Sequence, residues 1–225
     1  MSWFCLIHGS TQNPSGWDLL RPELEALGHK SIAVDLPTDT PEASAVAYAR
    51  SIVKALPADS SEVAVVAHSA SGIFLPLVAA QRPLRRMIFL AAAIPKVGFS
   101  FLDQFQAEPD MLHGDWIGKD PTNDDAIAMK FLFHDCPANI ARWALSTRRL
   151  MFAKQAIVEK CPLEVWPNVP ASYIVCQDDR TFSSEWSRRA SLERLGAKPL
   201  EIPGGHCPHV SRPAELARVL AALAP

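Results

Sequence analysis

The stretch VAVVAHSASGIFL, at residues 63–75, decides the prediction of the fold. Its first four residues are apolar and three of them are β-branched, which is typical of a buried parallel strand. A turn of small residues follows, with Ser69 at its centre, and then an apolar run with the character of a helix. Ala67 and Ser71, two residues before and after Ser69, are small enough for a strand and a helix to approach closely. The stretch predicts a tight strand-to-helix turn that presents the hydroxyl of Ser69, although a serine that caps an ordinary helix would show the same pattern.

Strands and helices alternate on both sides of this stretch. Apolar runs bounded by turn residues predict five further strands, at 3–7, 31–37, 86–93, 171–177 and 199–202. Helical spacing of apolar residues predicts helices at 17–27, 41–56, 71–80, 183–195 and 213–223. Such alternation is typical of a doubly wound, mostly parallel sheet with helices on both faces, here with about six strands. The predicted fold class is therefore α/β.

The alternation stops between residues 95 and 170. This part is rich in helix formers and in aromatic residues, among them Phe99, Phe101, Phe105, Trp116, Phe131, Phe133, Trp143 and Phe152. We expect a helical cap inserted into a core made of residues 1–94 and 171–225, the whole forming one structural domain. Caps of this kind cover a site with apolar side chains, and we expect about half of the aromatics to face it. We interpret two histidines here, His113 and His134, as surface or packing residues.

Composition excludes several classes of protein. With 225 residues, 48% of them hydrophobic and 20% charged, the chain suits one globular domain with a large core. A net charge of −2 and the lack of a basic stripe argue against nucleic acid or an anionic membrane as a partner. No apolar run is long enough to cross a bilayer. The first residues, 1–7, lack a charged segment and predict a strand and not a signal peptide.

Cysteine usage and motif content bear on compartment and cofactors. The five cysteines are an odd number, which predicts free thiols in a reducing, cytoplasmic compartment. No pair of cysteines has the spacing of zinc ligands, so no metal site is expected. No nucleotide or flavin motif is present, and Gly204-Gly205 is too short for a phosphate-binding loop. We expect no cofactor.

Three further segments complete a familiar constellation. His8-Gly9 ends the first strand, an Asp-Asp-Arg run at 178–180 follows a late strand, and Gly-Gly-His at 204–206 follows the last one. Together with Ser69 they give the chain order Ser, Asp, His, and the chain resembles the α/β-hydrolases, in which a nucleophile elbow carries the serine. The resemblance is strongest to the compact methylesterase and hydroxynitrile-lyase branch and to short bacterial hydrolases like it. It covers nearly the whole chain, is clearest at 3–10, 63–75, 173–182 and 203–213, and is loose through the cap. The usual elbow is Gly-x-Ser-x-Gly, and this chain departs from it at both glycines.

The resemblance implies a role for each residue. Ser69 would be the nucleophile, His206 the base and Asp179 the acid of a triad, and the backbone N–H groups of Ser10 and Ala70 would form the oxyanion hole.

Two assignments have a rival close by in the sequence. The resemblance puts the base directly after the Gly-Gly turn, which favours His206 over His209. It puts the acid directly before a basic residue, which favours Asp179 over Asp178, although the sequence pattern cannot separate two adjacent loop residues. Asp178 would then be a turn or capping carboxylate.

The implied activity is hydrolysis of a small carboxylic ester through an acyl-enzyme, with a small-molecule ester as the partner. A cofactor-free lyase of the hydroxynitrile-lyase type and a ligand-binding receptor are the alternatives. Lyases of the resembling branch carry a lysine directly after the triad histidine and a threonine in the His-Gly turn. This chain has Cys207 and Gly9 at those positions, which favours the esterase. A receptor would keep the triad residues, and the sequence leaves a homodimer open.

Overall fold

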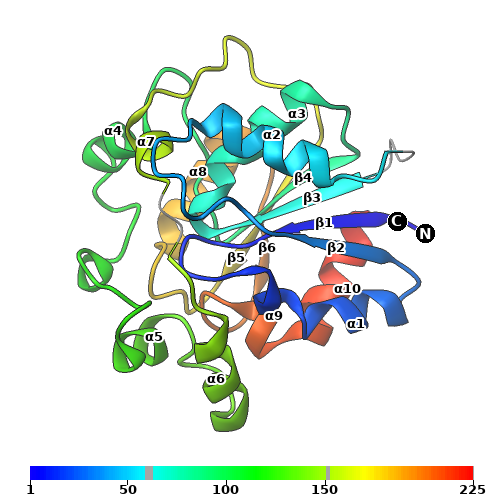
Figure 1. The fold of residues 1–225 in the computed structure, drawn as a ribbon, viewed down its shortest axis with the longest axis vertical. Helices are drawn as coiled ribbons and strands as arrows, with labels where there is room; N and C mark the ends of the chain where they lie inside the picture. The colour runs from blue at the N-terminus through cyan, green and yellow to red at the C-terminus, as the bar shows by residue number, and fades with distance from the viewer. Residues whose placement is uncertain (59–62, 151–152, 225) are drawn as a thin grey trace.

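The computed structural model describes residues 1–58, 63–150 and 153–224. Its centre is a sheet of six parallel strands in the order β2-β1-β3-β4-β5-β6 (Figure 1). The bounds of these strands are β1 (Trp3–Ile7), β2 (Lys30–Val34), β3 (Val63–His68), β4 (Arg86–Leu90), β5 (Ala171–Cys176) and β6 (Leu200–Ile202). The predicted number of strands and the parallel arrangement are both confirmed.

Helices cover both faces of the sheet, as predicted. Figure 1 shows α2 (Ala45–Ala55) and α3 (Leu75–Gln81) above it, and α1 (Leu20–Ala26) and α10 (Pro213–Leu223) below it. α8 (Ser184–Leu195) packs on the same face as α2 and α3. Side chains of β3 alternate between these layers: Val65 joins the core under α2, whereas Val66 joins the core over α1 and α10. Because both faces are buried, β3 needs an unbroken apolar sequence.

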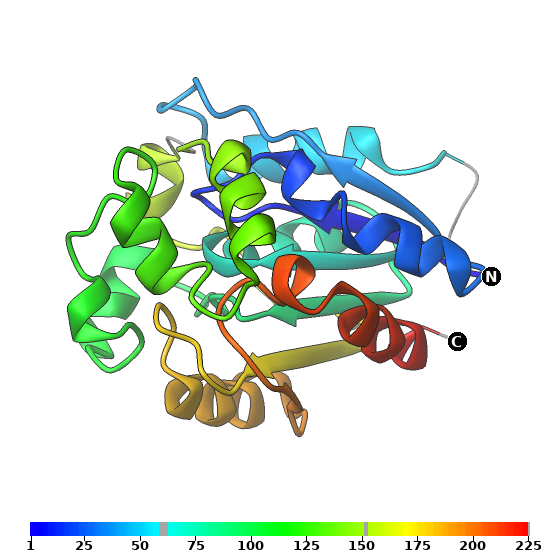
Figure 2. The ribbon, with the colours of Figure 1, turned by 90° about the horizontal axis from the view of Figure 1, so that it is seen from below.

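Among the described residues between β4 and β5, six helical segments lie beyond the carboxyl ends of the strands (Figures 1 and 2). We call them the cap: α4 (Phe101–Ala107), η3 (Gly114–Trp116), α5 (Asp125–Phe131), α6 (Ala138–Ala144), η4 (Leu145–Thr147) and α7 (Lys154–Val158). Leu132, Phe133 and Ala141 form a small cluster of the cap that also includes Cys207 and Val210 of the core, which lie in and just before α9 (Pro208–Ser211). The cap is thus packed directly onto the segment that follows His206.

Several element boundaries differ from the prediction. The helix predicted to begin at residue 17 is a short 3-10 turn, η1 (Pro14–Trp17), followed by α1. The helix predicted at 41 begins only at Ala45, where the Ser44 side chain accepts the N–H of Ala47. The helix expected after the serine turn begins as the 3-10 segment η2 (Ser69–Phe74). Its first carbonyl accepts the N–H of Ala93, at 3.0 Å, which ties the turn to the segment after β4.

Within the described residues, none of the helices combines the length and the apolar character needed to span a bilayer.

Candidate active site

Ser69 lies on a strained turn at the carboxyl end of β3. Its φ angle is +59°, in the left-handed region, which costs a residue with a side chain about 1–2 kcal/mol. Neighbouring contacts hold it there: Ala93 donates its N–H to the Ser69 carbonyl, and the Ser71 hydroxyl donates to the His8 carbonyl at 2.6 Å. A Cβ at Gly72 would overlap the Ala93 carbonyl oxygen. The turn therefore also packs closely at Gly72, against the segment that follows β4.

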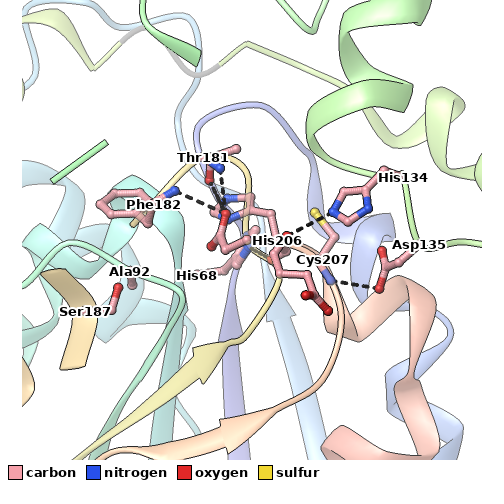
Figure 3. Close-up of polar contacts among 12 residues, drawn as sticks. His68, Ala92, His134, Asp135, Thr181, Phe182, Ser187, His206 and Cys207 are labelled. Carbon is pink, nitrogen blue, oxygen red and sulfur yellow. Dashed lines mark hydrogen bonds and ion pairs between the residues drawn. The ribbon is translucent and has the colours of Figure 1, made fainter. Parts of the chain in front are cut away.

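A second group of residues surrounds the imidazole of His206. Its Nδ1 lies 2.8 Å from Oδ2 of Asp179 and 2.7 Å from the hydroxyl of Thr181 (Figure 3). The other carboxylate oxygen, Oδ1, accepts the N–H groups of Thr181, at 2.7 Å, and Phe182, at 3.1 Å, and the Thr181 hydroxyl at 2.9 Å. His206, Asp179 and Thr181 are all buried. A proton on Nδ1 satisfies the carboxylate, so the lone pair of His206 is on Nε2, where a base needs it.

Asp178 and His209, the rival candidates for the acid and the base, make other contacts. Asp178 is exposed, and its Oδ2 accepts the Gly204 N–H at 3.1 Å. His209 is buried, and its Nε2 lies 3.0 Å from Oε1 of Gln12. Burial lowers the pKa of His209 to about 3, so its imidazole is neutral. The structure thus brings Asp179 to His206, and it pairs Asp178 with the next loop and His209 with Gln12.

Two more histidines are buried against this group. His68 donates Nε2–H to the carbonyl of His206 at 2.9 Å, and the two rings are 4.5 Å apart. Burial holds the pKa of His68 well below its ordinary value. His8 accepts the Leu36 N–H on Nε2 at 3.2 Å, and burial lowers its pKa to about 4. Both imidazoles are therefore neutral, and that of His68 packs directly against His206.

The proposed oxyanion donors lie on adjacent strand ends. β1 pairs with β3 in register, Ile7 opposite Ala67, so the backbone after Ile7 runs beside the serine turn. A Cβ at Gly9 would lie 2.9 Å from the Cβ of Ser69, which shows how closely the two loops approach. Among the described residues, the N–H of Ser10 donates to no acceptor, and the N–H of Ala70 donates to none outside η2.

A hollow of about 380 Å³ opens beside Ser10 and Thr11. Most of its walls are apolar, and the cap contributes Phe105, Trp116 and Ile117. Of the other cap aromatics, Phe133 and Trp143 belong to the cap's own cluster. Phe152 lies outside the described residues.

Sequence reasoning missed three contributors to the site. Thr181 bridges Asp179 and His206, but a threonine in a loop carries no signal of that role. His134 is a partly exposed residue that packs against the neighbouring loop, which agrees with the expectation, but the sequence did not indicate its contact with the carbonyl of Asp178 or the bond from the Gly205 N–H to Asp135. Both cap residues lie outside any motif.

The family model described as "Alpha/beta hydrolase family" matches residues 6–219. The chain belongs to the alpha/beta hydrolase family. The protein is accordingly an enzyme of the hydrolase class, and the predicted resemblance and fold class are confirmed.

The relatives of this α/β-hydrolase include esterases. Polyneuridine aldehyde esterase of Rauvolfia serpentina is 25% identical over 96% of this chain and 93% of its own length. Methylesterase 1 of Arabidopsis thaliana is 25% identical over 82% of this chain and 81% of its own. Among solved structures, polyneuridine aldehyde esterase superposes with a TM-score of 0.81 at 23% identity, covering all of both chains. A pyrethroid hydrolase superposes with a TM-score of 0.80 at 20% identity, covering 100% of this chain and 97% of its own. These structures share the fold.

Proposed function

We propose that the protein hydrolyses a small carboxylic ester through the triad Ser69, His206 and Asp179 and an acyl-enzyme intermediate. One observation carries the proposal: a buried histidine lies 2.8 Å from a buried carboxylate, and its carbonyl accepts a hydrogen bond from His68, the residue directly before a serine on a strained strand-to-helix turn. The esterase relatives support the choice of reaction.

In the first half of the reaction, Ser69 Oγ attacks the ester carbonyl while Nε2 of His206 takes its proton. Asp179 stabilises the imidazolium and fixes its tautomer. The carbonyl oxygen becomes an oxyanion that accepts the N–H groups of Ser10 and Ala70. The C–O bond of the leaving alcohol then breaks, and the alcohol departs with the proton from His206. An acyl group remains on Ser69.

In the second half, water attacks the acyl-enzyme and gives a proton to His206. The same two N–H groups hold the second oxyanion. When the bond to Ser69 breaks, His206 returns the proton to Oγ. The carboxylic acid leaves and the enzyme is restored.

The hollow beside Ser10 supports an ester with an apolar or partly aromatic group. A pocket of this size, with aromatic and aliphatic walls, favours a small uncharged substituent. We propose that Trp116 and Leu150 contact this group, since both line the hollow.

Two features support hydrolysis over cyanohydrin cleavage. Cys207 is buried, and burial raises the pKa of its thiol well above its ordinary value, so the residue after His206 carries no charge. A Cβ at Gly9 would lie 2.9 Å from Ser69 Cβ, which leaves no room for an extra hydroxyl-bearing side chain.

A cytoplasmic location belongs to the same proposal. All five cysteines, each within the described residues, are free thiols, which suits a reducing compartment.

The test is labelling and turnover. A serine-directed organophosphonate should label Ser69 and stop hydrolysis of p-nitrophenyl acetate and butyrate. Ser69→Ala and His206→Ala should each lower kcat by about 10⁴-fold or more. Ser146→Ala, which removes an exposed cap serine, is the matched control and should behave as the wild type.

Three results would contradict the proposal. Label on another serine, or full activity in Ser69→Ala, would show that Ser69 is not the nucleophile. Cyanide release from mandelonitrile, lost in Ser69→Ala, would indicate the lyase. A single stoichiometric burst without further turnover would indicate a receptor.

A further inference from the structure

The cap reaches down to the loops that carry the proposed acid and base. One of its contacts is the pair His134–Asp135, which follows the buried residue Phe133 between α5 and α6. Figure 3 shows His134 and Asp135 on the side of His206 away from Thr181 and Phe182. Nothing in the proposed mechanism uses these two side chains.

Asp135 binds the backbone directly before the base. Its Oδ2 accepts the N–H of Gly205 at 2.9 Å, and its side chain is only 10% exposed. The guanidinium of Arg212 approaches the same oxygen at 3.8 Å. Arg212 also lies 3.8 Å from Glu215, so it has a second carboxylate partner.

The two glycines before His206 make this contact possible. Gly204 has a φ angle of +93°, and a Cβ there would overlap Oδ2 of Asp135. A Cβ at Gly205 would lie 2.6 Å from Nε2 of His134 and 2.9 Å from Oδ1 of Asp135. The loop that carries His206, which we call the histidine loop, therefore has no side chains at the place where His134 and Asp135 of the cap pack against it.

The same cap segment also contacts the loop that carries Asp178 and Asp179, which we call the acid loop. His134 Nε2 lies 3.1 Å from the carbonyl of Asp178, directly before Asp179. Asp178 in turn exchanges hydrogen bonds with Gly204: its N–H donates to the Gly204 carbonyl at 3.0 Å, and its Oδ2 accepts the Gly204 N–H at 3.1 Å. The cap, the acid loop and the histidine loop are thus joined by hydrogen bonds that fix backbone positions.

We propose that Asp135 is a positioning residue that aligns His206 by accepting the N–H of Gly205. The alignment of the base then depends on how the cap packs against the core. The inference rests on the proposed function, since it needs His206 to be the base. Misplacing a catalytic group by about 1 Å can cost on the order of 100-fold in rate. Removing the carboxylate would free the Gly-Gly backbone, whose conformational freedom is the largest of any residue.

The experiment compares Asp135→Ala with Asp135→Asn on p-nitrophenyl butyrate. Asp135→Ala should lower kcat by about 10- to 100-fold with KM within about twofold, because the substrate hollow is untouched. Asp135→Asn should recover activity to within about threefold of the wild type, since its amide oxygen can still accept the Gly205 N–H. Asp115→Ala, which removes an exposed cap carboxylate that is 3.8 Å from Lys130, is the matched control and should change neither constant.

A second arm separates positioning from a merely structural role. In a His206→Ala background, Asp135→Ala should cause no further loss of the residual rate, because the residue through which it acts is gone. If Asp135→Ala does not fold, Asp135→Glu takes its place. The longer side chain keeps the charge but displaces the loop, and the same loss of kcat at unchanged KM is expected.

Each contrary outcome has its own meaning. Wild-type kcat in Asp135→Ala, with an active wild-type enzyme, would overturn the positioning role and leave the triad standing. Failure of Asp135→Asn to recover activity, or an equal loss in the His206→Ala background, would also overturn it. A wild-type enzyme that neither turns over the ester nor takes the organophosphonate on Ser69 would instead overturn the proposed function.

Discussion

Asp179→Asn should stop turnover by reversing the tautomer of His206. In the wild type, Oδ1 of Asp179 accepts two backbone N–H groups, from Thr181 and Phe182, while Oδ2 faces Nδ1 of His206 at 2.8 Å. The amide oxygen of an asparagine would stay where the two N–H groups point. Turning it around would leave both of these buried donors unpaired, at about 1–3 kcal/mol each. The NH₂ group must therefore face His206.

An NH₂ group at that place is a donor, so Nδ1 of His206 must become an acceptor and its proton must move to Nε2. Nε2 then has no lone pair with which to accept the proton of Ser69. Loss of the correct tautomer costs about 10⁴-fold in kcat in serine hydrolases of other folds. This corresponds to about 5.5 kcal/mol in the activation barrier. We expect a loss of that size, with KM changed little.

Asp178→Asn is the matched control. The carboxylate of Asp178 accepts the N–H of Gly204, which an amide oxygen can also accept, and the residue is exposed. Its kcat should stay within about threefold of the wild type. The assay is steady-state hydrolysis of p-nitrophenyl butyrate, with thermal unfolding of each variant measured in parallel.

The reasoning fails if Asp179→Asn, properly folded, keeps kcat within tenfold of the wild type. It fails equally if Asp178→Asn is the more damaging change, because the acid would then have to be reassigned.

Two further predictions concern stability. Gly72→Ala should lower the free energy of unfolding by about 1–3 kcal/mol, because the new methyl group would overlap the carbonyl oxygen of Ala93; an unchanged melting temperature would contradict the close approach. Stability should also fall in acid. Burial lowers the pKa of His8 to about 4 and that of His209 to about 3, whereas an unfolded histidine titrates near 6.5. The unfolded chain therefore binds more protons below about pH 6.5, and the free energy of unfolding should decrease from there down to about pH 4 through His8 and about pH 3 through His209, and be insensitive to these groups above pH 7. Urea titrations at several pH values would show this, His209→Gln should weaken the slope, and the exposed His113→Gln should not.

The sequence was sufficient for the fold and for the order of the candidate triad. Apolar runs such as the one before Ser69 are long enough and β-branched enough to predict buried parallel strands. Parallel strands end at the same edge of a sheet, so residues placed just after them converge even when they are far apart in the chain. That rule brings His206 and Asp179 together without any knowledge of side-chain contacts. It does not separate Asp179 from Asp178, and there the family resemblance made the choice.

Tertiary structure decided what lies around those residues. In the loop after β5, the side chain of Asp179 is buried and bonded to Thr181, whereas that of Asp178 is exposed and bonded to Gly204. The hydrogen bond from Gly205 to Asp135 joins residues 70 positions apart. Periodicity in a sequence records which face of a helix or strand is buried, but a loop has no period. The direction of a loop side chain is set by the distant segments that pack against it, and here the cap is the segment that does so.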